Sequence, residues 1–196
     1  MRKTTLIGAL AAFLLCPVAA SAATLVFQGQ LLASAENPPV ASSGSGAATV
    51  SFDDVTNELT VAATFTGLTG TTTVAHIHCC AATLANNAGV ATQTPTFSLF
   101  PAGVTSGVFS QTLDLDDPTS FNAAFITNNG GTVSSAIAAL LAGLVAGQAY
   151  FNVHTTFAPG GELRANLAQV PIPGAVFLFA AGLAGMIGAR RGKAPV

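Results

Sequence analysis

Three histidines are the residues of this sequence best suited to chemistry, and they are the only histidines among its 196 residues. His76 and His78 stand two positions apart in a stretch that reads as a β-strand. Their side chains therefore point to one face, about 6.6 Å apart along the strand. His154 lies near the end of another predicted strand. If those strands are neighbours, the three imidazoles converge and form a Zn²⁺ or Cu²⁺ site, since imidazole nitrogen suits both ions.

The same histidines also fit a structural interpretation, in which they hydrogen-bond across strands or to loop carbonyls. Under the metal interpretation, Cys79, Cys80 or Glu162 would supply a fourth ligand. The adjacent cysteines leave three states open: a disulfide between sequence neighbours, soft metal ligands beside His78, or bridges to another chain. The aspartates lack the regular spacing of a calcium-binding loop and are interpreted as solvated turn residues.

The elements that must position these residues read mainly as β-strands. Apolar side chains alternate with small polar ones in short segments separated by glycine- and threonine-rich connections. The predicted strands are residues 24–32, 48–52, 58–65, 74–78, 107–113, 149–154 and 162–167. Residues 53–57 predict a hairpin turn, and residues 79–106 and 116–134 predict long loops.

One segment departs from this pattern. Between residues 134 and 146, Ile137, Leu140 and Leu144 fall at helical spacing, which predicts one short amphipathic helix. The sequence therefore predicts an all-β fold, an antiparallel Greek-key sandwich or barrel of immunoglobulin-like type, with one short helix.

Several motifs in this order resemble the CHRD domain, a family found in chordin and in many bacterial secreted proteins. The most specific pieces are Ala-His-Ile-His at residues 75–78, Tyr-Phe-Asn-Val-His-Thr at 150–155 and Gly-Glu-Leu-Arg at 161–164. Glu-Asn-Pro-Pro-Val at residues 36–40 precedes them. The resemblance covers about residues 24–168 and implies an extracellular β-domain without a settled biochemical activity.

The N-terminus predicts a secretory signal peptide over residues 1–22. Arg2 and Lys3 precede an apolar stretch, and small residues follow it up to an Ala-x-Ala site formed by Ala20 and Ala22. The mature body then spans residues 23–169.

The C-terminal residues 170–196 resemble the sorting tail of the PEP-CTERM family of exosortase substrates, in its Val-Pro-x-Pro variant. The motif is Val170, Pro171, Ile172 and Pro173, followed by an uncharged apolar run over 174–189 and a basic end. A 16-residue helix there would be about 24 Å long, slightly short of a bilayer core of about 30 Å. This predicts a transmembrane helix in the inner membrane, a body outside the cytoplasm and an exosortase-type processing enzyme as partner. An ordinary uncleaved anchor is the alternative.

Charge excludes one class of partner. All eight acidic residues but only Arg164 among the basic residues fall within 23–169, so this body carries about seven net negative charges. Such a body cannot neutralise phosphates, which excludes nucleic-acid binding. We expect a secreted, non-enzymatic surface or matrix protein that binds extracellular polysaccharide or surface proteins. The alternative is an extracytoplasmic Zn or Cu protein that uses the three histidines. A dismutase-like metalloenzyme is disfavoured, because the acidic body would repel superoxide.

Overall fold

The computed structural model of the chain describes residues 24–83 and 85–170. In this part of the chain, eight strands form one antiparallel sheet, in the order β4-β6-β7-β1-β2-β3-β5, with β8 pairing with β1 as well. The strands are β1 (Thr24–Leu32), β2 (Ser45–Asp53), β3 (Glu58–Thr66), β4 (Thr72–His78), β5 (Gly107–Asp114), β6 (Tyr150–Thr155), β7 (Leu163–Asn166) and β8 (Ala168–Gln169).

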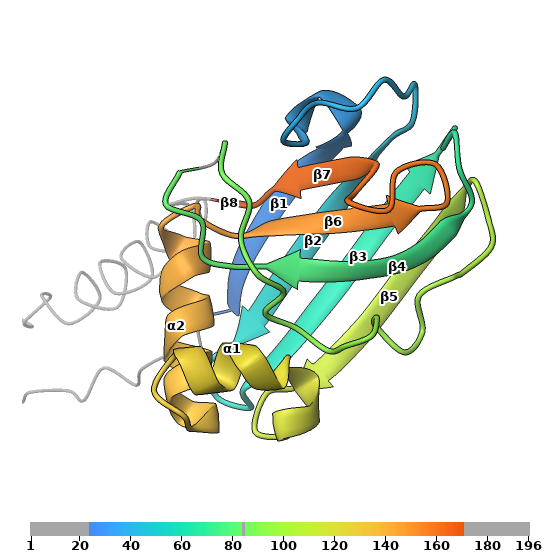
Figure 1. Ribbon diagram of the computed structural model, residues 1–196. Coiled ribbons are helices and arrows are strands. Elements are labelled where there is room, and N and C mark those ends of the chain that lie inside the picture. The colour runs from blue at the N-terminus through green and yellow to red at the C-terminus, as the bar shows by residue number, and fades with distance from the viewer. Residues whose placement is uncertain (1–23, 84, 171–196) are drawn as a thin grey trace, which may run out of the picture.

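The sheet curves into a half-barrel that encloses a single core (Figure 1). β4, β6 and β7 lie in front of β2, β3 and β5 in this view, so the two ends of the sheet face each other. Phe109 of β5 and Phe151 of β6 meet across this core with ring centroids 6.4 Å apart. The predicted all-β, antiparallel fold is confirmed, although its strands form one continuous sheet rather than the two separate sheets of an immunoglobulin sandwich.

The hairpin between β2 and β3 forms at the predicted turn. Backbone N–H groups of Val55 and Thr56 donate to the Asp53 side chain, and Asn57 takes the left-handed conformation with φ of 54°. Asn tolerates this conformation better than most residues. The turn fixes the register Asp53↔Glu58, which continues along both strands.

The predicted helix is present as α2 (Val133–Val145). Thr132 begins it through a capping box with Ser135, and Leu140 and Leu144 bury its apolar face in the core. A second helix, α1 (Ala123–Asn128), occupies part of the loop predicted at 116–134, after the short 3₁₀ turn η2 (Pro118–Ser120). Both helices lie at one end of the half-barrel (Figure 1). A further 3₁₀ turn, η1 (Ala33–Ala35), follows β1.

One part of the sheet is buried on both faces. Every residue of β6 is buried. Alternation places Phe151 and Val153 in the core and Tyr150, Asn152 and His154 on the opposite face, where loops cover them. The loop after β4 also closes the outer edge of β4, since Ala91 and Phe97 donate backbone hydrogen bonds to Ile77 and Ala75.

Among the described residues, no helix is long and apolar enough to cross a membrane. The predicted signal peptide with Ala20 and Ala22, the residues Pro171, Ile172 and Pro173 of the sorting motif, and the predicted transmembrane helix lie outside the described residues. Val170 is the last described residue, and its N–H donates to the carbonyl of Val26 in β1.

Candidate metal centre

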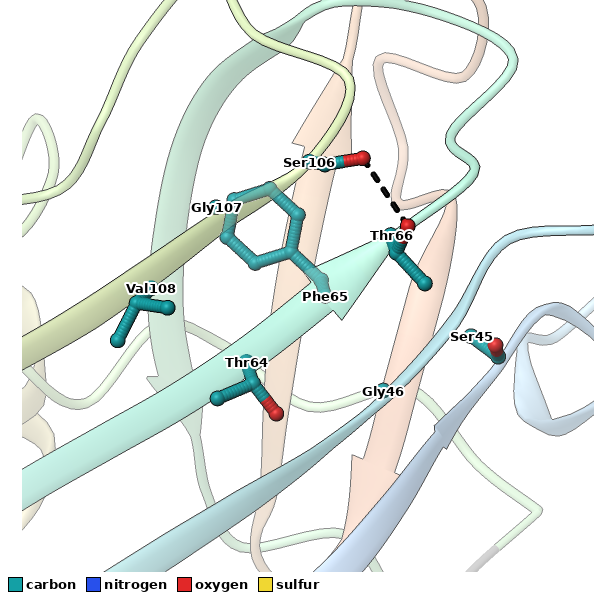
Figure 2. Close-up of a pocket in the computed structure, with 8 residues that line it drawn as sticks. All are labelled: Ser45, Gly46, Thr64, Phe65, Thr66, Ser106, Gly107 and Val108. Atoms are coloured by element: carbon teal, nitrogen blue, oxygen red, sulfur yellow. Dashed lines mark hydrogen bonds between the residues drawn. The ribbon is translucent and has the colours of Figure 1, made fainter.

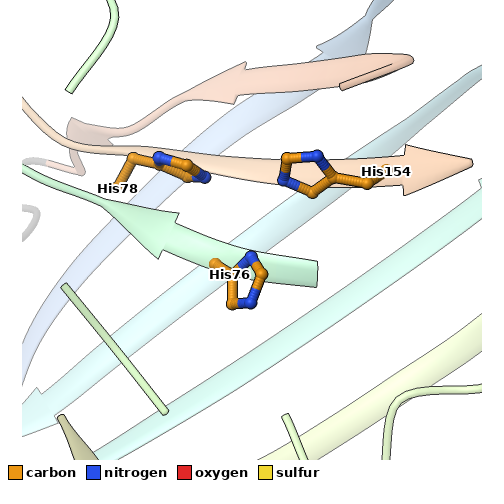
Figure 3. A group of neighbouring side chains, drawn as sticks. All are labelled: His76, His78 and His154. Carbon is orange, nitrogen blue, oxygen red and sulfur yellow. The ribbon is translucent and has the colours of Figure 1, made fainter. Parts of the chain in front are cut away.

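The pairing of β4 with β6 brings the three histidines together on the loop-covered face. In the register of these strands, His76 lies opposite Asn152, His78 opposite Tyr150, and His154 opposite Val74. His154 is therefore diagonal to His76, while His76 and His78 share one face as the sequence predicted. The three rings lie around a common space (Figure 3).

The separation of the rings is compatible with one ion. One ring nitrogen of each histidine lies within 4.8 Å of the corresponding nitrogens of the other two, and the ring centroids are 5.5–5.9 Å apart. A tetrahedral zinc ion with Zn–N bonds of about 2.0–2.1 Å sets its ligand nitrogens roughly 3.4 Å apart. Binding would thus draw the rings inward by small side-chain rotations.

Each imidazole is fixed by a backbone carbonyl from a loop. Nε2 of His76 donates to Pro95 O (2.7 Å), Nδ1 of His78 to Ala88 O (2.9 Å) and Nδ1 of His154 to Pro159 O (2.8 Å). A carbonyl can only accept, so these bonds assign the proton of each ring to the bonded nitrogen. Metal-ligating histidines in proteins are oriented by outer hydrogen bonds of this kind.

The remaining nitrogen of each ring has a lone pair and no partner. Nδ1 of His76 and Nε2 of His78 and His154 are buried and form no hydrogen bond within the described structure. An unpaired buried polar atom costs free energy, so three of them in one cluster need an explanation. A shared metal ion would satisfy all three.

Burial also keeps the rings in the form that binds metal. Desolvation lowers the pKa of His76, His78 and His154, and the pKa of His78 falls to about 4. The charges of His154, His76 and Arg164 lower the pKa of His78 further. All three imidazoles are therefore neutral at neutral pH, as ligation requires.

Tyr150 and Arg164 support His78 from one side. The Tyr150 ring stacks on His78 with centroids 4.8 Å apart, and the Arg164 guanidinium lies 3.4 Å from the Tyr150 ring centroid. Arg164 is fully buried and also donates to the side chains of Asn166 and Asn87 and to the carbonyl of Asn86. Arg164, the only arginine or lysine between residues 23 and 169, thus stacks on the Tyr150 ring beside the candidate ligand His78, in a cation–π arrangement.

Glu36 and Asn152 form a second polar pair on this face. The Asn152 amide donates to Glu36 Oε2 at 3.4 Å, while Glu36 Oε1 and Asn152 Oδ1 are buried and unpartnered. Burial raises the pKa of Glu36 to about 7, against the opposing effects of Arg164 and of the Asn152 hydrogen bond. Glu36, Asn152, Tyr150 and Arg164 were not predicted as site residues from the sequence. For Tyr150 and Asn152 the available signal was that polar side chains alternate along β6 with His154.

The predicted auxiliary ligands are committed to other bonds. Cys79 and Cys80 form a disulfide with each other, so neither offers a thiolate. The Glu162 carboxylate accepts hydrogen bonds from Ser42, Thr155 and the N–H groups of Thr69 and Gly70. These bonds outweigh the effect of burial and hold the pKa of Glu162 below its usual value. Its role is to tie the loop after β3 to the start of β7.

A groove of about 510 Å³ lies at the ends of β2, β3 and β5 (Figure 2). Its polar groups are mostly hydroxyls, and Thr66 and Ser106 bond to each other across it at 3.1 Å. It contains no titratable side chain among its lining residues Ser45, Gly46, Thr64, Phe65, Thr66, Ser106, Gly107 and Val108. It therefore offers none of the ligands found in the histidine cluster.

The fold and the site define an antiparallel β-domain with a three-histidine cluster beneath its loops. The chain belongs to the CHRD-domain family, because the model of the CHRD domain matches residues 27–167. No curated protein and no solved structure matches the chain.

Proposed function

We propose that this CHRD-domain protein is a non-enzymatic, extracytoplasmic protein that binds one zinc or copper ion through His76, His78 and His154. The observation that carries the proposal is the set of three inward-facing nitrogen lone pairs, all buried and all without a protein partner. Three neutral nitrogen ligands suit zinc and copper rather than magnesium or calcium, which prefer oxygen.

The three-ligand set leaves a coordination position for water or for a group of a partner molecule. We propose that this protein is exported and delivered to the cell surface or extracellular matrix through an exosortase-type enzyme. The resemblance of the tail to PEP-CTERM signals and the extracellular character of the CHRD family support this route. In that setting a surface protein or polysaccharide of the matrix would complete the coordination.

The test is the metal content of the full-length protein, measured by inductively coupled plasma mass spectrometry after incubation with excess zinc or copper and desalting. We expect about one ion per chain and its loss in the triple variant His76→Ala/His78→Ala/His154→Ala. Thr60→Ala serves as the control, because its hydroxyl pairs with Thr112 rather than with the histidines. A folded wild-type sample that retains neither metal would make the histidines a structural polar cluster.

A further inference from the structure

The Cys79–Cys80 disulfide joins two sequence neighbours directly after His78, at the end of β4. Cys79 is buried, at 5% exposure, whereas Cys80 is exposed. The disulfide therefore follows one of the three candidate ligands without an intervening residue.

The disulfide and His78 are held by the same three loop residues. The carbonyl of Ala88 accepts from His78 Nδ1 at 2.9 Å, and the carbonyl of Gly89 accepts from the N–H of Cys79 at 3.1 Å. Val90 forms an isolated β-bridge with His78. Any displacement of Cys79 is thus passed to the loop that sets the orientation of the His78 ring.

The other side of the disulfide is blocked by α2. A Cβ on Gly143 would overlap the sulfurs of both cysteines, so the helix backbone touches them directly. Two bonded sulfurs are about 2.05 Å apart, whereas non-bonded heavy atoms prefer about 3.5–4.0 Å. Reduction makes the sulfurs separate, and because α2 leaves no space on its side, we expect them to move away from α2, toward the side where Cys79 and Cys80 adjoin Gly89 and Val90.

A reductant can reach this bond. Cys79 and Cys80 form part of the lining of a surface pocket of about 280 Å³, between residues 89–90 and α1. A thiolate entering it would attack the sulfur of Cys80, the more exposed residue of the pair, since exchange requires access to one sulfur.

We infer that the Cys79–Cys80 disulfide is a redox latch on the histidine cluster: oxidised, it holds His78 in place for metal binding, and reduced, it weakens that binding. A dithiol reductant supplies the two electrons. One of its thiolates attacks Cys80 Sγ to form a mixed disulfide and expels the Cys79 thiolate. Its second thiolate then releases Cys80. Cys79 and Cys80 each take up a proton, and the reductant leaves as a disulfide. The inference rests on the proposed metal-binding function.

The test compares the zinc affinity of the full-length protein before and after reduction with dithiothreitol, which is removed anaerobically before a chromophoric chelator competes for the zinc. We expect reduction to weaken binding about 10–100-fold, the usual effect of losing outer-sphere support. The variant Cys79→Ser/Cys80→Ser should bind as weakly as the reduced protein and should not respond to dithiothreitol.

A second readout separates a latch from a general loss of stability. Imidazole resonances in NMR spectra of the metal-free protein should shift on reduction for His78 but not for His154, which Pro159 anchors instead. Equal zinc affinity in both redox states would overturn the latch and leave the metal site intact. Tighter binding after reduction would also overturn it. No zinc binding in either state would overturn the latch and the proposed function together.

Discussion

Backbone carbonyls, rather than other side chains, set the orientation of the three imidazoles. Ala88 and Pro95 lie in the loop between β4 and β5, and Pro159 lies in the loop between β6 and β7. Each carbonyl bonds one nitrogen of its histidine and leaves the other nitrogen without a protein partner. A purely structural cluster would be expected to use both nitrogens of at least one ring. The consistent choice of one nitrogen in each ring is what favours a metal.

The Glu36–Asn152 pair has a simple chemical explanation. A protonated Glu36 carboxyl can donate from Oε1 to Asn152 Oδ1 while Asn152 donates to Oε2, which gives both unpartnered oxygens a hydrogen bond. Gly161 makes this contact possible, because a Cβ there would lie 2.5 Å from Asn152 Oδ1 and 2.6 Å from Glu36 Oε1. Ionisation of Glu36 would replace one of these bonds with two facing acceptors.

This pair predicts a pH dependence of stability. The pKa of Glu36 is about 7 in the folded protein and 4.5 in the unfolded chain, so the folded state binds more protons between these values. The contribution of Glu36 is therefore fully present below about pH 4.5 and is lost as the pH rises through 7. Glu36→Gln, which keeps both hydrogen bonds without a charge, should raise the free energy of unfolding at pH 8 by about 1–2 kcal/mol and have little effect at pH 4.

Urea denaturation at the two pH values measures this effect. Glu58→Gln is the matched control, since Glu58 is exposed. Replacing its carboxylate should change the free energy of unfolding only slightly, and by a similar amount at pH 4 and at pH 8. A Glu36→Gln variant that is less stable than the wild type at pH 8 would mean that the ionised carboxylate is the stabilising form.

The sequence was sufficient to group the three histidines but not to predict what surrounds them. His76, His78 and His154 could be grouped because alternation within a strand fixes the face on which a side chain lies. The carbonyls of Ala88, Pro95 and Pro159 could not be predicted, since loop paths depend on tertiary packing and not on local pattern.

At the scale of elements, α2 is shaped by the disulfide that it contacts. A glycine in a helix usually costs about 1 kcal/mol relative to alanine, yet Gly143 occupies the position in α2 where both sulfurs approach the helix backbone. Its missing side chain provides space that the Cys79–Cys80 pair fills.

Gly143→Ala should therefore destabilise the protein despite its better helix propensity. Overpacking typically costs about 1–3 kcal/mol, which exceeds the gain of about 1 kcal/mol in propensity. Thermal unfolding followed by circular dichroism would measure the change. Gly160→Ala is the control, because nothing lies within 4 Å of its Cβ position, and it should change the stability by about 0.5 kcal/mol at most. A Gly143→Ala protein more stable than the wild type would contradict the close contact.

The elements were predictable to different degrees. β1, β3 and β5 were predicted almost to the residue, because one face of each is buried and the other exposed, which gives clear alternation. α1 was missed because six residues form too short a segment for helical periodicity. The sequence left a sandwich and a barrel open, and the single curved sheet is closer to the barrel. The choice could not be made in advance, since the contact between Phe109 and Phe151 depends on how the strands curve over the core.

At the scale of the whole molecule, the two ends of the domain meet. β8 pairs with β1, with Gln169 opposite Phe27, and Val170 bonds to Val26. The proposed signal-peptide site and the proposed sorting motif are therefore attached to one small region of the folded body. Removal of both segments would leave the sheet complete.

We predict two cuts in a host that contains an exosortase. Intact-mass spectrometry of the exported product should give a chain that starts at Ala23 and lacks the apolar segment 174–189. The double variant Pro171→Ala/Pro173→Ala should keep that segment, because the processing enzyme would no longer recognise its motif. Ala168→Ser, just outside the motif, is the control. A wild-type product that retains residues 174–196 in such a host would indicate a permanent anchor.

The closed edge of β4 matters for a protein that we propose is displayed on a crowded cell surface. An exposed strand edge is a template onto which a neighbouring chain can add a strand, and proteins displayed at high local concentration are most at risk. Here the loop bonds to Ala75 and Ile77 occupy the free backbone groups of the strand that carries His76 and His78. The loop that shapes the histidine cluster thus also prevents neighbouring copies from assembling into fibres at that edge.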